Sequence, residues 1–250
     1  MARAAFIYDF DGTLAKGNIQ ETAFIPAIGM TKGDFWKEVK SRTKTEDADQ
    51  ILIYMQLMLE KAKDAVIAVT KESLAKHGSS VELFPGLADG SWFDRTNKFA
   101  EEHDLNLDHY ILSSGTLEMI NGCPISRYFK KIFASKYMYV DETAIWPCVA
   151  INYTTKTQYL FRLNKGIENT WNDDDLNKFT PENKRPLPFE NMVFFGDGDT
   201  DVPTMKMLKH KGGTSVAVYE QKEKKGLDKI HKLLSNERVD FTAPADYKEH

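Results

Sequence analysis

Short apolar runs that end in turn residues recur along the chain, and longer amphipathic stretches separate them. The first run covers residues 4–8, and later ones cover 109–112, 192–195 and 215–218. Runs of this length, bounded by Gly, Asp or Ser, are typical of strands that a parallel sheet buries on both faces. The stretches between them predict helices, and this alternation predicts an α/β fold with a parallel sheet.

The stretch after the first strand has a different pattern, because it is poor in turn residues and rich in Lys, Glu, Ala, Leu and Met. It predicts several helices inserted between strands. We expect this helical insert at residues 17–83, with residues 1–16 and 84–250 forming the core domain. The apolar positions that recur there at helical spacing are Ile51, Leu52, Met55, Leu59 and Ala62.

Three further elements are predicted in the second half of the chain. Residues 148–153 and 158–163 are expected to pair as a hairpin about a turn at 154–156. A charged helix is expected at 222–234 and a last strand at 239–241.

Composition narrows the classes of partner. The 250 residues carry 33 Lys and Arg against 37 Asp and Glu, a net charge of −4. Nucleic acids and anionic membranes require clustered positive charge, so neither is expected as a partner. The two cysteines cannot form a disulfide framework, and no apolar run reaches the length of a signal-peptide core or a membrane span. We expect a cytoplasmic protein.

Carboxylates follow two of the predicted strands. Asp9 and Asp11 follow the first, and Asp197, Asp199 and Asp201 follow a later one. Ligands of parallel sheets lie beyond the carboxyl ends of the strands, so the two groups are expected to meet there. Carboxylates brought together repel one another, and a hard cation with oxygen ligands removes that cost. Mg²⁺ held this way usually binds a substrate phosphate as well, which indicates phosphate chemistry.

Four segments resemble the motifs of the haloacid dehalogenase superfamily. Residues 6–14 resemble the first motif, 111–115 the second, Lys165 with Gly166 the third, and 195–201 the fourth. The resemblance implies an α/β fold with a Rossmann-like three-layer parallel sheet core and a small α-helical cap domain. Because the insert lies between the first and second motifs, the chain is most similar to the phosphoserine-phosphatase-like branch.

The resemblance also implies roles for the acidic residues. Asp9 is the expected nucleophile, forming an aspartyl-phosphate, and Asp11 the expected general acid and base. Mg²⁺ is expected at Asp9, the backbone carbonyl of Asp11, and Asp197. Asp201 is expected to orient a metal-bound water or the motif lysine, and Asp199 to lie in an outer sphere around the metal.

The remaining motifs imply a phosphate site. Ser113, the backbone amide of Ser114, and Gly115 are expected to contact the phosphoryl group, although helix capping also explains the serine pair. Lys165 is expected to neutralise Asp9 and the phosphate together. The phosphoserine phosphatases carry a glutamate for the substrate amine where this chain has Asn18, with Glu21 three residues on. This departure argues against a free amino-acid substrate.

The predicted function is a Mg²⁺-dependent phosphatase that hydrolyses a small phosphomonoester metabolite, acting as a monomer or homodimer. A phosphotransferase or phosphomutase with the same intermediate is an alternative. A non-catalytic protein that binds a phosphorylated ligand is another, and the proton donor Asp11 argues against it.

Overall fold

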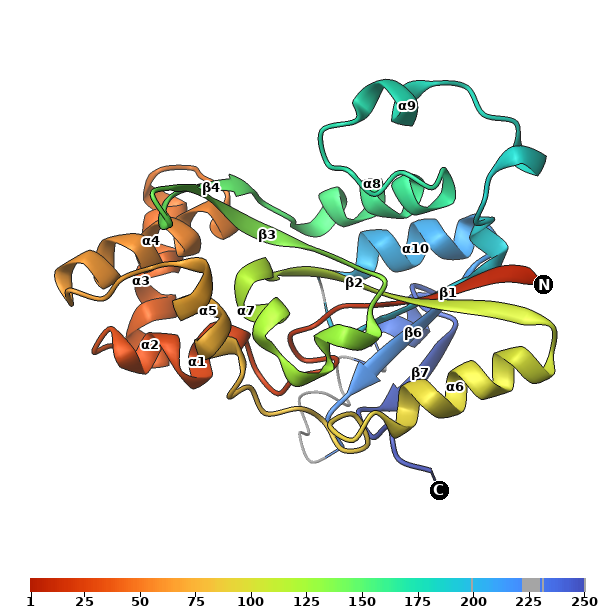
Figure 1. Ribbon diagram of the computed structural model, residues 1–250, viewed down its shortest axis with the longest axis horizontal. Coiled ribbons are helices and arrows are strands. Elements are labelled where there is room, and N and C mark those ends of the chain that lie inside the picture. Colours follow the sequence, from red (N-terminus) through yellow and green to blue (C-terminus); the bar gives the residue numbers. More distant parts are fainter. Residues whose placement is uncertain (199, 222–229, 231, 250) are drawn as a thin grey trace.

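The computed structural model describes residues 1–198, 200–221, 230 and 232–249. Within this part of the chain, seven strands form one sheet in the order β4-β3-β2-β1-β5-β6-β7 (Figure 1). All neighbours are parallel except β3 and β4, which form an antiparallel hairpin. The strands are β1 (Ala2–Tyr8), β2 (Leu105–Thr116), β3 (Lys131–Val140), β4 (Thr143–Val149), β5 (Met192–Gly196), β6 (Thr214–Tyr219) and β7 (Phe241–Pro244).

Helices cover both faces of the sheet. The helices α8 and α10 lie on one face, and α6 and α7 lie on the other (Figure 1). Successive side chains of a strand point to opposite faces, so each strand serves two cores. Ile7 packs into the cluster under α8 and α10, whereas Tyr8 packs into the other. The helices that cover the sheet are α6 (Ser91–Glu102), α7 (Leu117–Gly122), α8 (Tyr153–Asn164) and α10 (Val202–His210). A short helix, α9 (Asp173–Asn177), lies in the loop after α8.

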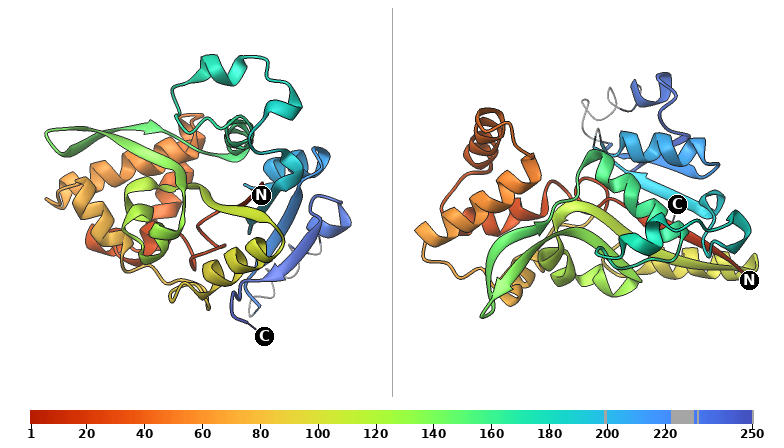
Figure 2. Two further views of the ribbon diagram at one scale, coloured as in Figure 1. Left: turned by 45° about the vertical axis from the view of Figure 1, so that its right-hand side comes forward. Right: turned by 90° about the horizontal axis from the view of Figure 1, so that it is seen from above.

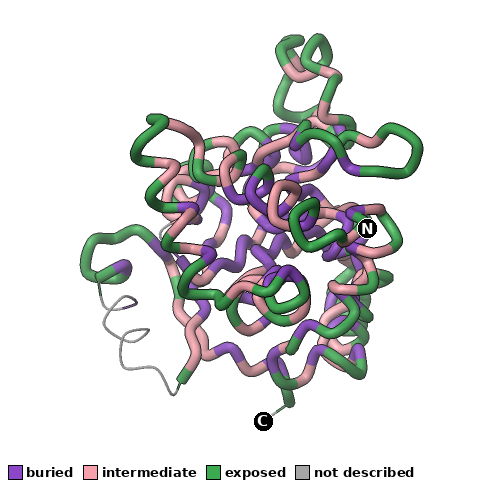
Figure 3. The backbone as a smooth tube through the Cα atoms, turned by 90° about the vertical axis from the view of Figure 1, so that its left-hand side faces the viewer, coloured by how far each residue is buried: buried purple, intermediate pink, exposed green. Residues whose placement is uncertain are grey.

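This arrangement confirms the predicted α/β fold with a mostly parallel sheet. Buried residues run through the middle of the molecule, and exposed ones lie along the outer loops (Figure 3). None of the described helices is long and apolar enough to cross a bilayer.

The helices of the predicted insert lie together at one end of the sheet, beside the carboxyl end of β1 (Figure 2). The division of residues 17–83 from the core as a separate domain stays a prediction. The helices are α1 (Ile19–Thr22), α2 (Phe24–Ala27), α3 (Lys32–Thr45), α4 (Gln50–Asp64) and α5 (Lys71–Gly78).

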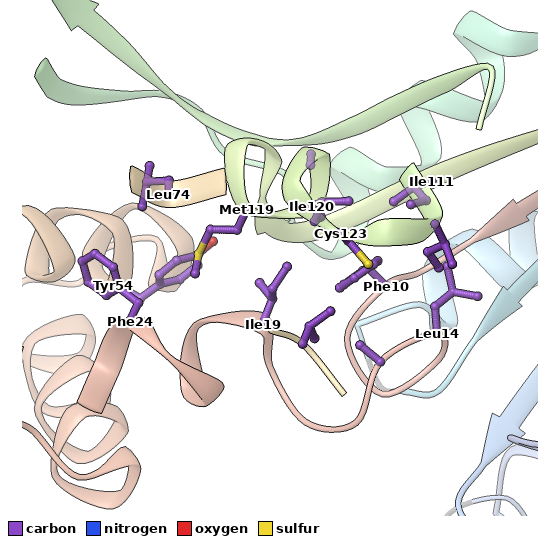
Figure 4. Close-up of a cluster of buried hydrophobic side chains, with 14 of the residues drawn as sticks. Phe10, Leu14, Ile19, Phe24, Tyr54, Leu74, Ile111, Met119, Ile120 and Cys123 are labelled. Carbon is purple, nitrogen blue, oxygen red and sulfur yellow. The ribbon is translucent and has the colours of Figure 1, made fainter. Parts of the chain in front are cut away.

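The insert is joined to the core through α5, which packs directly on α7. A Cβ atom added to Gly78 would lie 1.8 Å from the carbonyl oxygen of Met119. One added to Gly122 would lie 1.9 Å from that of Ala75, so the two glycines let the helix backbones touch. Met119 and Ile120 of α7 share one apolar cluster with residues of the insert (Figure 4). This contact fixes α5 of the insert directly against α7.

We predict that Gly78→Ala destabilises the protein by about 3 kcal/mol, because the added methyl group forces α5 and α7 apart. Gly33→Ala is the matched control, since Gly33 lies in α3 and a Cβ atom there would meet only Thr31 Oγ1, at an ordinary contact distance of 3.8 Å. That change is expected to be neutral or stabilising by about 0.5 kcal/mol. Urea denaturation measures both. Equal stability of the two variants would show that the close approach of α5 and α7 is not required.

The predicted hairpin between residues 148–153 and 158–163 is wrong. The hairpin of the structure is β3–β4, turning at Asp141 and Glu142, both at positive φ. Residues Tyr153–Asn164 instead form α8, which begins with a reciprocal capping box between Asn152 and Thr155. This local capping and the burial of one helix face outweigh the β propensity of the Thr and Tyr residues.

Two other predictions fall near the end of the chain. The charged helix predicted at 222–234 lies largely outside the described residues. The last strand forms at Phe241–Pro244 rather than at 239–241. It pairs with β6, where Val216 lies opposite Phe241.

A buried polar chain crosses from α6 to β1 and β2. Trp92 Nε1 donates to the Tyr8 hydroxyl over 2.9 Å, and that hydroxyl donates to His109 Nδ1 over 3.1 Å. His109 Nε2 then donates to Asn97 Oδ1 over 3.1 Å. The amide oxygen of Asn97 can only accept, so Nε2 carries a ring hydrogen. Burial lowers the pKa of His109 to about 4, so the ring is neutral and its Nδ1 accepts from Tyr8.

This chain of hydrogen bonds predicts a stability change with pH. In the unfolded chain His109 titrates near its ordinary pKa of about 6.5, so below that pH the unfolded state binds more protons than the folded state. Stability is then lost as the pH falls from about 6.5 toward 4. We expect the wild type to lose about 2 kcal/mol more than His109→Gln over that interval, measured by urea denaturation. Identical pH profiles would contradict the neutral, buried imidazole.

Candidate active site

The two predicted carboxylate groups meet at the carboxyl ends of adjacent strands. β1 and β5 pair in parallel with Tyr8 opposite Phe195, so Asp9 and Asp197 follow neighbouring strand ends. Carboxylate oxygens of Asp9, Asp197 and Asp201 all lie within 4.8 Å of one another. The structure thus brings together residues that are far apart in the sequence.

Backbone contacts hold Asp9 in a fixed orientation. Its amide donates to the Phe195 carbonyl over 2.8 Å, which continues the β1–β5 pairing by one residue. Its Oδ1 accepts from the Phe10 amide over 2.8 Å, and the side chain is almost fully buried. The other oxygen, Oδ2, faces the ammonium group of Lys156.

The turn after β1 requires a glycine. Gly12 has φ +75°, and a Cβ atom there would lie 2.6 Å from the carboxyl group of Asp197. A side chain would therefore be strained in conformation and would also collide with the acidic cluster. The absence of a side chain lets the loop after β1 approach the loop after β5, which places the two acidic groups against each other.

Lys156 is the cation of the site. Its Nζ lies 2.8 Å from Asp9 Oδ2 and 2.7 Å from Asp201 Oδ1, and Lys156 and Asp201 are both fully buried. Burial alone would lower the pKa of Lys156, but the two carboxylates outweigh it and raise that pKa, so the ammonium stays charged. Burial and Asp9 raise the pKa of Asp201, and Lys156 opposes this rise.

The prediction that Lys165 reaches Asp9 is wrong. Lys165 Nζ donates to the backbone carbonyls of Leu176 and Lys178, where it holds the loop around α9. Lys165 lies nine positions after Lys156. At about 100° per residue, they therefore lie on opposite sides of the helix. Only one of the two can face the sheet, and it is Lys156.

A sequence signal for Lys156 exists. Lys156, Tyr159, Leu160 and Leu163 recur at i, i+3, i+4 and i+7, and all four are buried in α8. Asn152 followed three residues later by Thr155 is a recognisable helix start. Had this segment been predicted as a helix, the lysine on its apolar face would have stood out, because lysines are almost never fully buried without a partner.

Asp11 lies beside the acidic cluster but is held differently. Its Oδ1 accepts from the amide of Ile19, at the beginning of α1, over 2.8 Å. Burial and the neighbouring charge of Asp9 raise its pKa well above the usual range for an aspartate. Asp11 thus favours the protonated form that a proton donor needs, and it connects the site to the first helix of the insert.

The two serines of the second motif have different surroundings. Ser113 is fully buried, and its hydroxyl accepts from the Gly115 amide over 3.0 Å. Ser114 lines the cavity described below, and its buried hydroxyl has no hydrogen-bond partner. A Cβ atom on Gly115 would lie 3.1 Å from Asp11 Oδ2, so this glycine leaves room for the acid.

Other residues considered from the sequence are placed as follows. Asp199 lies outside the described residues. Glu21 accepts hydrogen bonds from Asn18 and Trp36.

A cavity of about 950 Å³ opens onto the acidic cluster. Its floor includes Asp9, Asp11 and Asp197, and its opposite side is built by α3 and the start of α4. Tyr54 of α4 closes one edge and donates its hydroxyl to the Ser114 carbonyl over 2.7 Å. The cavity is large enough for a phosphate ester with a sizeable alcohol.

No model of a known protein family matches the chain. An uncharacterized protein of Borreliella burgdorferi is 27% identical, over 97% of this chain and 91% of the relative. Among solved structures, apo phosphoserine phosphatase superposes with a TM-score of 0.58 at 16% identity, covering 98% of this chain and 94% of that chain. A HAD family hydrolase of Salmonella enterica serovar Typhi gives a TM-score of 0.57 at 16% identity, covering 96% of this chain and 66% of that chain.

The similarity to phosphoserine phosphatase covers nearly the whole chain, the helical insert between β1 and β2 included. The predicted resemblance is confirmed at the level of the fold. The chain has the fold of haloacid dehalogenase family hydrolases, in the form found in phosphoserine phosphatases.

Proposed function

We propose that the protein is a Mg²⁺-dependent phosphatase that hydrolyses a small phosphomonoester through an aspartyl-phosphate on Asp9. The observation that carries this proposal is the buried Lys156, which bridges Asp9 and Asp201 at the bottom of the cavity. A buried ammonium between carboxylates is costly to keep in the fold, and perturbed groups of this kind concentrate at functional sites.

In the first half of the reaction, an Asp9 carboxylate oxygen attacks phosphorus as the bond to the leaving alcohol breaks. Asp11 transfers its proton to the departing alkoxide oxygen. The phosphate contacts come from the unpartnered hydroxyl of Ser114 and from the turn that Ser113 stabilises with Gly115. Lys156 keeps its positive charge beside Asp9 and offsets the charge of the incoming phosphate.

In the second half, Asp11 takes a proton from water as the water oxygen attacks phosphorus. The bond between phosphorus and Asp9 breaks, inorganic phosphate leaves, and both aspartates return to their starting states. Asp201 fixes Lys156 throughout by their 2.7 Å contact.

The donor set fits a hard divalent cation. Three carboxylates converge within 4.8 Å and one ammonium faces them, so negative charge remains in excess. Asp9 and Asp197, with the backbone carbonyl of Asp11, would hold Mg²⁺. When bound, the ion supplies charge stabilisation for the phosphoryl oxygens.

The proposal is tested by phosphate release from p-nitrophenyl phosphate and from a panel of phosphorylated metabolites. We expect turnover with Mg²⁺, its loss on removal of metal by EDTA, and recovery when Mg²⁺ is restored. Transfer of the phosphoryl group to an added alcohol, without free phosphate, would indicate a phosphotransferase instead. Tight binding of a phosphoester with no turnover across the panel would contradict the proposal.

A further inference from the structure

One face of α3 forms part of the lining of the cavity. Trp36, Lys40 and Thr43 line the cavity, and their spacing of i, i+4 and i+7 places them in one row along that helix. The indole nitrogen of Trp36 donates to Glu21 over 2.7 Å, so the ring is held in place. A leaving alcohol that fills the cavity must meet this row, which we call the α3 row.

The carboxylates near the α3 row are already engaged. Glu21 does not line the cavity; its Oε1 accepts from both Asn18 and Trp36, and its Oε2 lies 4.0 Å from Lys32 Nζ. Asp49 lines the cavity, but its Oδ1 accepts from the amides of Ile51 and Leu52 as the N-cap of α4. Its Oδ2 accepts from Asn152. Among the described residues on the helical side, Asp49 is therefore the one carboxylate that lines the cavity, and both of its oxygens already accept hydrogen bonds.

The polar groups of the cavity that have no partner favour a negative charge and hydroxyl groups over an ammonium group. Lys40 lines the cavity and makes no hydrogen bond or ion pair with any described residue. Gln20, which is 1% exposed, lines the cavity with a buried amide oxygen that has no partner. The Thr43 hydroxyl is likewise buried and unpartnered. Together they offer one positive charge and neutral oxygens that accept hydrogen bonds from hydroxyl groups.

We infer that the alcohol part of the substrate carries hydroxyl groups and a second negative charge, which Lys40 pairs, and no ammonium group. Sugar-acid phosphates have this chemistry, whereas phosphorylated amino acids and amino sugars do not. The inference rests on the proposed phosphatase activity and specifies its substrate class. An ammonium group would lie beside Lys40 without a free carboxylate to compensate it, and like charges this close repel.

Two matched pairs of substrates test the charge preference. 6-Phosphogluconate and sorbitol 6-phosphate differ in a carboxylate, and glucose 6-phosphate and glucosamine 6-phosphate differ in an amine. We expect kcat/KM to favour 6-phosphogluconate over sorbitol 6-phosphate about fivefold, as a solvent-accessible ion pair allows. Glucosamine 6-phosphate is expected to have a lower kcat/KM than glucose 6-phosphate. The carboxylate preference should shrink as salt is raised.

Lys40→Met and Lys37→Met assign the preference to one residue. Lys37 is an exposed lysine of the same helix that does not line the cavity. Lys40→Met is expected to reduce the ratio of kcat/KM between 6-phosphogluconate and sorbitol 6-phosphate to about 1. Lys37→Met should leave that ratio as in the wild type.

The outcomes separate this inference from the proposed function. Wild-type turnover with equal kcat/KM for both members of each pair would overturn the inference and leave the phosphatase intact. Equal effects of the two lysine variants, or a preference for the amine, would overturn it as well. Absence of turnover on every phosphoester would instead overturn the proposed function, and the inference with it.

Discussion

Replacing Asp9 with Asn lowers kcat/KM for phosphomonoesters by at least about 10³-fold, because the amide cannot attack phosphorus. The change keeps the size of the side chain, and Oδ1 can still accept from the Phe10 amide. It removes one negative charge from a cluster that has an excess of them. The variant should therefore fold, and we expect the substitution to act by lowering kcat. Continuous assay of phosphate release measures it.

Asp94→Asn is the control for this variant. Asp94 is an exposed carboxylate in α6 and does not line the cavity. It should keep wild-type activity. An Asp9→Asn protein that retains more than about a tenth of the wild-type kcat would rule out Asp9 as the nucleophile, since loss of a nucleophile costs far more.

The second large effect is a difference in activity between variants of Lys156 and Lys165. Lys156→Met is expected to lower kcat/KM about 10²- to 10³-fold, because a preorganised charge beside the reacting phosphate is lost. Lys165→Met is expected to leave kcat/KM within about twofold of the wild type, because its ammonium contacts loop carbonyls and not the acidic cluster. Steady-state kinetics on p-nitrophenyl phosphate compare the pair.

Loss of a buried cation also threatens the fold. Without Lys156, the buried Asp201 and Asp9 repel each other, at a cost of about 3–5 kcal/mol. The double variant Lys156→Met, Asp201→Asn removes that repulsion and is expected to recover stability but not activity. Recovery of activity along with stability would show that Lys156 has a structural role alone. An Lys165→Met variant as inactive as Lys156→Met would contradict the site assignment.

Elements with strong local patterns were predicted well from the sequence. The apolar runs at 4–8, 109–112, 192–195 and 215–218 all lie in strands of one sheet. Their burial on both faces leaves continuous apolar residues, which few other structures explain. The meeting of Asp9 with Asp197 followed from the same reasoning, because the ends of adjacent parallel strands share one edge.

The failures have two sources. In residues 153–164 the β propensity of Thr and Tyr was given more weight than the helix start at Asn152 and the helical spacing of the buried residues. That one error moved the motif lysine, because reading α8 as a hairpin leaves no reason to bury Lys156. The α5–α7 contact at Gly78 and Gly122 was also missed, since the spacing of single glycines does not show which backbone approaches them.

The uses of polar residues in the insert could not be read from the sequence. Glu21 and Asp49 are acidic residues near the cavity, and either one is a reasonable candidate for binding an amine. The structure assigns Glu21 to Trp36 and Asp49 to the N-cap of α4. Hydrogen-bond partners of this kind depend on tertiary geometry. They decide which charged groups are left to contact a substrate.

Chemical trapping of the phosphorylated enzyme tests Asp9 as the nucleophile most directly. Protein quenched in acid during turnover is treated with borohydride, which reduces an acyl phosphate to an alcohol, and its peptides are analysed by mass spectrometry. An aspartyl-phosphate on Asp9 predicts conversion of that side chain to the alcohol in wild-type protein given substrate and Mg²⁺, and no conversion without substrate. Rapid turnover with Asp9 unmodified, or with the modification on another residue, would contradict it.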